Sequence, residues 1–308
     1  MKQKAAILCI VAAGLFWGTS GLFVSFFSAF GLSSLQITSV RAVTAGIAMA
    51  IFLLIYNRKL FKVSFKEVLL FLCSGSAIYL TAAAYFSAIR ASSVSIAVVL
   101  MYTSPVMVML FSVLFMKEKF SALKGVSVAV MIAGCALVSG ITEGFNLSPL
   151  GFLLGMASAV MYSAYNIFTK LQMKRGINPF TASTYSFIFM GVFSLFGANP
   201  PDLAAKLSAA PEKLIPMGIL LGIVTCVMPY LLYTISLSSL EVSTAATLSV
   251  IEPLAATIFS VMFIEGEELS IPAAIGILLI VSAVVLLSRE GTSAKGKMKA
   301  CGSLEEKI

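Results

Sequence analysis

One helix-length stretch of this chain carries a polar and aromatic stripe. The spacing i, i+3, i+4, i+7 is followed by Tyr162, Tyr165, Asn166 and Thr169, which places them on one helix face. Aromatic faces attract cations by roughly 0.5 to 2 kcal/mol each when water is excluded, and phenol hydroxyls can bind carboxylates or hydroxyl groups. Because such a stripe is unfavourable against lipid, we expect it to face the protein interior and to bind a small solute.

Other aromatic residues with polar groups lie in further apolar segments. The sequence predicts that four of them line the same substrate-binding pocket, namely Trp17, Tyr79, Tyr102 and Tyr230. Tyr56, Tyr85 and Tyr233 lie near the ends of their segments, where interfacial anchoring or helix–helix contact is the alternative interpretation.

Two ionisable residues interrupt the apolar segments. Glu252 precedes Pro253 near the middle of its segment, and Arg41 lies in the outer half of another. Burial favours the neutral form of a carboxyl group, which can then take up and release a proton at physiological pH. Glu252 therefore predicts proton coupling or charge compensation of a cationic solute, with a structural ion pair or a cap at the helix bend as the alternative. Arg41 could reach the outer surface, fix helix ends or contact the solute.

Pro105, Pro229 and Pro253 lie well inside apolar segments. A proline in mid-helix removes a backbone hydrogen bond and bends the helix, which membrane proteins tolerate beside neighbouring helices or a cavity. Pro105 and Pro253 occupy equivalent positions in an internal repeat, so their helices should bend at matching depths. Paired bends suit gating around a central cavity, and a static kink is the alternative.

The elements that hold these residues are transmembrane helices. Of the 308 residues, 59% are apolar and only 11% are charged, and the mean hydropathy is +1.03, which indicates a membrane protein. A helix needs ~20 apolar residues to cross the hydrocarbon core. Ten such spans are predicted, at residues 5–27, 34–56, 67–89, 93–116, 122–140, 149–170, 180–197, 214–237, 243–264 and 272–288.

The two halves of the chain repeat each other. Residues 12–40 align without a gap on 157–185, and at nearly the same offset Tyr85 aligns on Tyr233 and Pro105 on Pro253. Each half holds five spans, an odd number, so the second half should cross the membrane in the opposite sense. The predicted fold is all-α, with two inverted five-helix repeats around a central cavity. The predicted units are residues 1–140 and 149–288, followed by a disordered cytoplasmic tail at 289–308.

The loops predict the orientation, because Lys and Arg are retained on the cytoplasmic side. With the N-terminus inside, the 21 basic residues all lie in inner segments except Arg90, Lys206 and Lys213 in outer loops and Arg41 within a span. Both termini are therefore expected in the cytoplasm. The net charge of +8 then reflects topology and attraction to the lipid bilayer, and no nucleic-acid partner is expected.

Several kinds of chemistry are excluded by composition. The chain has no histidine, and its five cysteines stand singly, so no metal site or redox pair is expected. It has no phosphate-binding loop and no serine or zinc hydrolase motif, so neither a cofactor nor ATP-driven transport is expected. A membrane-embedded enzyme would need several catalytic groups at one depth and is a remote alternative.

Several short strings stand in a characteristic order along the chain, and the proline followed by an acidic residue occurs in both halves. They are Leu15-Phe16-Trp17-Gly18, Arg41, Pro105 followed by Glu118-Lys119, and Ile251-Glu252-Pro253 followed by Glu267-Glu268-Leu269-Ser270. In these strings the chain resembles the drug/metabolite transporter superfamily, in particular the EamA-type carriers, over residues 7–288. Lys117 stands before Glu118 where the family usually has glycine.

The resemblance implies inverted repeats around a central cavity and alternating access. It also implies substrate contacts at Trp17, Tyr79, Tyr102, Tyr162, Asn166, Tyr230 and Glu252, with structural or gating roles for Glu118 and Glu267. We therefore expect a secondary transporter of a small organic metabolite in the bacterial inner membrane, an amino acid or an organic cation, with proton coupling through Glu252. The alternatives are a uniporter or exchanger of a neutral or anionic metabolite and, more remotely, an enzyme, channel or sensor. Direction and oligomeric state stay open, a monomer included.

Overall fold

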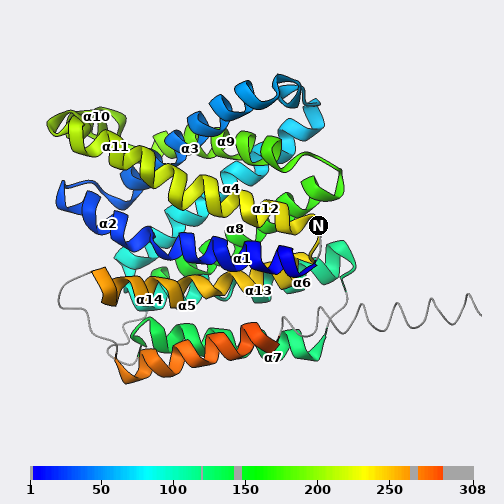
Figure 1. The fold of residues 1–308 in the computed structure, drawn as a ribbon. Helices are drawn as coiled ribbons and strands as arrows, with labels where there is room; N and C mark the ends of the chain where they lie inside the picture. The colour runs from blue at the N-terminus through cyan, green and yellow to red at the C-terminus, as the bar shows by residue number, and fades with distance from the viewer. Residues whose placement is uncertain (1–2, 119–120, 142–147, 264–269, 287–308) are drawn as a thin grey trace, which may run out of the picture.

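The computed structural model describes residues 3–118, 121–141, 148–263 and 270–286. Every regular element in these ranges is helical, and the helices run side by side along a common direction (Figure 1). Eight helical segments are long and apolar enough to cross a membrane. Two more, α7 and the helix Ile271–Leu286, are apolar but shorter. The predicted tail, together with Glu267, lies outside the described residues.

The first half holds α1 (Gln3–Gly18), α2 (Ser20–Ala29), α3 (Ser34–Tyr56), α4 (Phe65–Ala91), α5 (Val94–Met101), α6 (Ser104–Met116) and α7 (Ala122–Val138). The second holds α8 (Pro149–Lys174), α9 (Pro179–Ala198), α10 (Pro200–Ala209), α11 (Pro211–Gly222), α12 (Met228–Leu237), α13 (Val242–Leu248), α14 (Glu252–Phe263) and the helix Ile271–Leu286. A short 3₁₀ helix covers Arg58–Phe61. The loop expected at 197–213 instead contains the short helix α10, because prolines at its start suit the first turn of a helix.

Several spans are broken in the middle. The α5–α6 span breaks at Tyr102 and Thr103, and the α13–α14 span passes through the 3₁₀ turn Ser249–Ile251. Pro105 and Pro253, which are repeat equivalents, each lie in the first turn after the break. Proline is accepted there because the first helical N–H groups have no partner within the helix.

Two further spans are irregular. The α11–α12 span contains a π-helical segment, Ile223–Val227, directly before Pro229. The α1–α2 span breaks at Thr19, whose hydroxyl donates to the Phe16 carbonyl at 2.7 Å. Local π-helical segments are frequent at functional sites. The irregular spans are therefore the part of the fold where a functional site is expected.

Glycine pairs let the helices approach closely within the chain. A Cβ added at Gly14 would lie 2.1 Å from Ile251, and one at Gly18 would lie 2.5 Å from Ala255, so α1 packs tightly on the broken α13–α14 span. Gly155 in α8 meets Leu100 of α5 in the same way. Small residues at such contacts favour helix association in lipid. Lipid tails are as apolar as the helices, so close packing takes the place of the hydrophobic effect.

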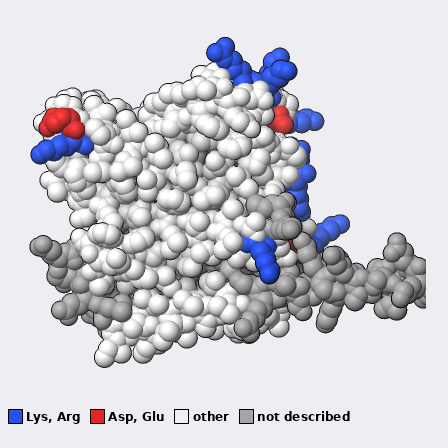
Figure 2. All heavy atoms as spheres, in the orientation of Figure 1, with Lys and Arg blue, Asp and Glu red and all other residues white. Residues whose placement is uncertain are grey.

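The distribution of charged and apolar residues on the surface is that of a bundle of membrane-spanning helices. Figure 2 shows a wide band without charged residues, with Lys and Arg gathered at the end of the molecule where Figure 1 places the N-terminus. The opposite end, at α10, carries both signs of charge. Large apolar side chains such as Leu8, Ile55 and Phe196 are exposed, as expected of helices that face lipid.

Candidate functional site

Aromatic rings from four spans meet in the interior. Trp17 of α1 contacts Tyr230 of α12 with ring centroids 4.9 Å apart in an edge-to-face arrangement. Tyr165 of α8 and Phe187 of α9 approach the same Tyr230 ring edge-on, at 5.6 Å and 5.7 Å. The four side chains are almost fully buried. Edge-to-face pairs are favourable because the positive ring edge meets the negative face, so Tyr230 is the centre of an aromatic cluster.

The predicted polar stripe of α8 does face the interior. Tyr162 and Tyr165 stack with centroids 6.2 Å apart. Asn166 has no exposed surface, and its amide donates to the Tyr162 carbonyl at 2.7 Å. The Tyr233 hydroxyl donates to the Asn166 side-chain carbonyl. Asn166 therefore connects α8 with α12 in this conformation, because both ends of its amide have partners.

Glu252 lies at one of the two paired helix breaks. It begins α14, and Tyr102, which ends α5 at the other break, places its hydroxyl next to the Glu252 carboxyl group. Tyr162 lies next to Ser249 in the 3₁₀ turn and within electrostatic range of Glu252. Tyr85 of α4 is also within this range. The breaks thus bring the carboxyl group and three phenols together.

Arg41 belongs to the interior face of α3. It lies within electrostatic range of Glu252 and of Cys226 and Tyr230, which belong to the irregular α11–α12 span. Its Nε is buried and has no hydrogen-bond partner among the described residues, and the same holds for the Trp17 indole nitrogen. Buried donors without partners are costly. A guanidinium and a carboxyl group therefore face a common region that contains unpaired donors.

Tyr79 packs against the same core as the aromatic cluster, but its hydroxyl lies against α9, only 2.5 Å from the position that a Cβ at Gly197 would take. Tyr233, which the sequence left as an anchor or a helix contact, is fully buried beside Trp17, at 5.8 Å between centroids, and so belongs to the cluster. Its spacing of three residues from Tyr230 was the signal for a shared helix face. Tyr56, by contrast, is exposed near a helix end.

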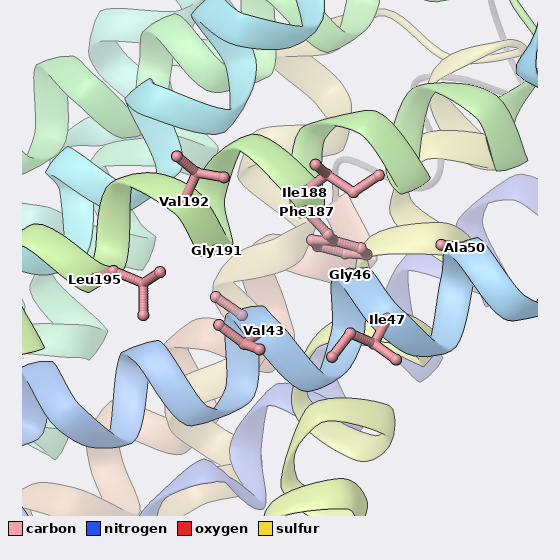
Figure 3. Close-up of a pocket in the computed structure, with 10 residues that line it drawn as sticks. Val43, Gly46, Ile47, Ala50, Phe187, Ile188, Gly191, Val192 and Leu195 are labelled. Atoms are coloured by element: carbon pink, nitrogen blue, oxygen red, sulfur yellow. The ribbon is translucent and has the colours of Figure 1, made fainter. Parts of the chain in front are cut away.

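A separate groove opens between α3 and α9 (Figure 3). It encloses about 280 Å³ and is lined by Ala42, Val43, Gly46, Ile47, Ala50, Phe187, Ile188, Gly191, Val192 and Leu195. Ile47, Val192 and Leu195 are substantially exposed. Apart from Phe187 the lining shares nothing with the aromatic cluster, and its apolar, open walls are those of a lipid-facing surface.

The fold and the buried polar interior together define a multi-span membrane protein of the carrier type. The EamA-like transporter family model matches residues 4–140 and again 149–289. The chain belongs to this family, so it is a membrane transporter and not an enzyme.

Relatives of similar length match the chain over nearly its whole length. The chain is 26% identical over 318 residues to the uncharacterized transporter YxxF of Bacillus subtilis, covering 100% of this chain and 97% of the relative. It is 24% identical to YwfM of the same organism, covering 94% and 95%. It is 23% identical to the uncharacterized inner membrane transporter YicL of Salmonella typhimurium, covering 93% and 96%. A solved crystal structure superposes with a TM-score of 0.73 at 18% identity, covering 93% of this chain and 98% of that one, which supports the fold.

Proposed function

We propose that this transporter is a secondary carrier that moves a small organic metabolite across the cytoplasmic membrane by alternating access. The observation that carries the proposal is the pair of broken spans, α5–α6 and α13–α14, which place Tyr102 next to Glu252. Tyr162 connects this pair to the aromatic cluster, because it lies within electrostatic range of Glu252 and stacks on Tyr165. Interrupted helices at corresponding positions of two repeats are the sequence and structural mark of substrate sites in such carriers.

The proposed topology has two inverted halves, residues 1–140 and 149–288, with both termini in the cytoplasm. The odd number of spans in each half supports inversion, and the clustering of basic residues at one end supports the orientation (Figure 2). A position in the inner membrane is in line with the name of the Salmonella relative. A central cavity between the halves belongs to the same proposal.

The preferred cargo is an amino acid or an organic cation. Trp17, Tyr230 and Tyr162 offer ring faces to a positive group, and Glu252 offers the opposite charge. Glu252 has a second role in this proposal, as the group that carries a proton. A mid-span carboxyl group that exchanges substrate for a proton would couple the two gradients.

Arg41 supports a second candidate, an exchanger or uniporter of a carboxylate-bearing metabolite. Its buried Nε lacks a partner in the described part of the chain. A guanidinium binds carboxylates through paired hydrogen bonds. A zwitterion would satisfy both Arg41 and Glu252, whereas a simple anion would use only Arg41.

A binding panel separates these cargoes. The detergent-purified protein is heated with amino acids, quaternary amines, sugars and organic anions at two pH values, because a ligand of the folded state raises its stability. Shifts with cations that disappear in Glu252→Gln support the preferred cargo, and shifts with anions that disappear in Arg41→Gln support the alternative. In proteoliposomes, a Glu252→Gln variant that transports as well as the parent, with and without a pH gradient, would refute the coupling role.

A further inference from the structure

The end of the molecule that holds the N-terminus contains a group of interacting charges outside the proposed substrate site, in which the two lysines are buried and Glu241 is exposed. We call Glu118, Lys124, Lys170 and Glu241 the charged cluster. Glu118 follows α6, and its carboxylate accepts from the Val242 N–H at 2.9 Å and the Ser243 hydroxyl at 2.7 Å. These groups form the N-terminus of α13, where unpaired N–H groups favour a negative charge. Glu118 therefore joins the first half of the chain to the broken span of the second.

The two lysines make further links at the same end. Lys124 of α7 forms an ion pair with Glu241 and donates to the Ser243 hydroxyl at 3.4 Å. Lys170 of α8 donates to the Leu237 carbonyl at 2.6 Å, at the C-terminal end of α12. Lys124 and Lys170 are only 7% and 9% exposed, so their charges rely on these partners. A cation at the C-terminus of a helix is also favoured by the helix dipole.

The cluster lies at the end of α6 and at the start of α13, away from the breaks in the two spans. At this end α6 packs on α13. At the other end the same two spans pack on different helices, α5 on α4 and α8, and α14 on α1 and α2. Separation of α6 from α13 would remove the contacts of Glu118 with Val242 and Ser243 and the pairing of Lys124 with Glu241. Each of these contacts joins one half of the chain to the other.

Three of the four repeat partners of the cluster carry no charge, whereas Glu118 aligns on Glu267, which lies outside the described residues. Lys170 aligns on Ser25 and Glu241 on Ser93. Lys124 lies three residues after the helix-preceding Ser121, and the corresponding position after Ser270 is Ala273. Ser93 only caps its own helix, accepting from the Ile96 N–H at 3.3 Å.

At the other end, the described residues at the matching positions make hydroxyl-to-carbonyl bonds. Ser95, the partner of Ser243, donates to the Ser139 carbonyl. Ser148 donates to the Ala91 carbonyl at 2.6 Å. Hydrogen bonds with an ionised partner are about twice as strong as neutral ones. Among the described residues, the contacts at the end that holds the N-terminus are therefore charged, whereas those at the matching positions of the other end are neutral and weaker.

We infer that the charged cluster is a one-sided cytoplasmic gate, which makes the cytoplasm-closed conformation the resting state of the carrier. The inference rests on the proposed alternating access and adds which side is closed without solute and which residues close it. Opening toward the cytoplasm requires that Glu118 leave the N-terminus of α13 and that Lys124 and Glu241 separate. Binding of solute or proton must supply the free energy for that step.

Solvent accessibility of a cysteine behind the gate tests this inference without any solute. Thr247 lies one turn beyond Ser243 in α13, is 2% exposed, and bonds only within its own helix in the described structure. Thr247→Cys is introduced into a variant without the native cysteines, and labelling by a membrane-impermeant maleimide is measured in inside-out vesicles. Labelling should be slow in this parent. It should rise about tenfold with Glu118→Gln, as expected for the loss of a charged hydrogen bond.

Three further variants control for misfolding and for nonspecific effects of charge. Lys124→Glu should raise labelling, and the exchange Lys124→Glu with Glu241→Lys should return it toward the parent rate, which a misfolded protein could not do. Lys206→Met removes a cation from the surface ion pair with Asp202 at the other end and should leave the rate unchanged.

Unchanged labelling in both Glu118→Gln and Lys124→Glu would overturn the gate. Fast labelling of the parent would overturn the cytoplasm-closed resting state. Failure of the proposed function looks different: the accessibility changes would occur, but no solute of the panel would bind or be transported. Loss of transport with unchanged accessibility would refute the gate and leave the carrier function intact.

Discussion

The contact between α1 and the α13–α14 span offers a matched pair of alanine substitutions. A Cβ at Gly18 would lie 2.5 Å from the Ala255 Cβ and 2.8 Å from the Ala256 backbone nitrogen, so the two helices would have to move apart. A Cβ at Gly21, in α2 of the same span, would meet no atom of the described structure within 4 Å. The two variants thus differ in packing but share the change of residue type.

The expected difference in the free energy of unfolding follows from the one term that the two substitutions do not share. Alanine is favoured over glycine inside a helix by roughly 0.5 to 1 kcal/mol, and both variants gain this term. Overpacking of a tight contact costs about 1 to 3 kcal/mol, and only Gly18→Ala incurs it because its nearest obstacles include backbone. The free energy of unfolding of Gly18→Ala should therefore be about 1 to 3 kcal/mol below that of Gly21→Ala.

Unfolding of the detergent-solubilised protein by increasing SDS measures this difference. Gly21→Ala is expected to match or exceed the parent. Gly18→Ala should also weaken any solute-induced thermal shift, because α14 begins at Glu252 and moves with the displaced contact. Equal stability of the two variants would refute the close packing of α1 on α14 and with it the placement of Trp17 beside the break.

Three further changes test single contacts. Lys117→Gly should raise the free energy of unfolding in SDS by about 1 kcal/mol, because Lys117 has φ 57°, a left-handed conformation that favours glycine; destabilisation would contradict that conformation. Tyr233→Phe should lower it by about 1 to 3 kcal/mol, since the buried Asn166 carbonyl loses its donor, and an unchanged value would contradict the bond. Lys206 holds the pKa of Asp202 below its usual value of 3.8, so this carboxylate stabilises the fold above that pH and loses its effect as the pH falls through the lowered pKa. The thermal stability of Asp202→Asn should therefore approach that of the parent in acid, and a constant gap would refute the linkage.

The sequence predicted the spans well because one physical quantity, the thickness of the hydrocarbon core, sets their length. Span 34–56 agrees with α3 at both ends, and 180–197 differs from α9 by one residue at each end. The broken spans were anticipated at Pro105 and Pro253, since proline limits a helix locally. The break at Thr19 had no such signal, because neither glycine nor proline directly follows it.

Side-chain partners were less predictable than helix faces. Periodicity assigned Tyr162 and Asn166 to one interior face of α8, but it could not show that Tyr233 would occupy the Asn166 carbonyl. Tyr79 has the same residue type and a similar depth as the cluster tyrosines, yet its hydroxyl lies against Gly197. Which helix a residue meets depends on how neighbouring spans are rotated and tilted, and those are set by packing between distant segments.

Lys117, directly before Glu118, stands where the family usually has glycine. The backbone at Lys117 keeps the left-handed conformation that glycine would adopt freely, and the next residue reaches the N-terminus of α13 from this turn. A strained turn is retained where the surrounding structure determines it. In the proposed inverted arrangement the two ends of the fold share one backbone design, so a preference for one closed end would come from side chains that the halves do not share. Glu241 opposite Ser93 and Lys170 opposite Ser25 are two such differences among the described residues, and both strengthen the same end.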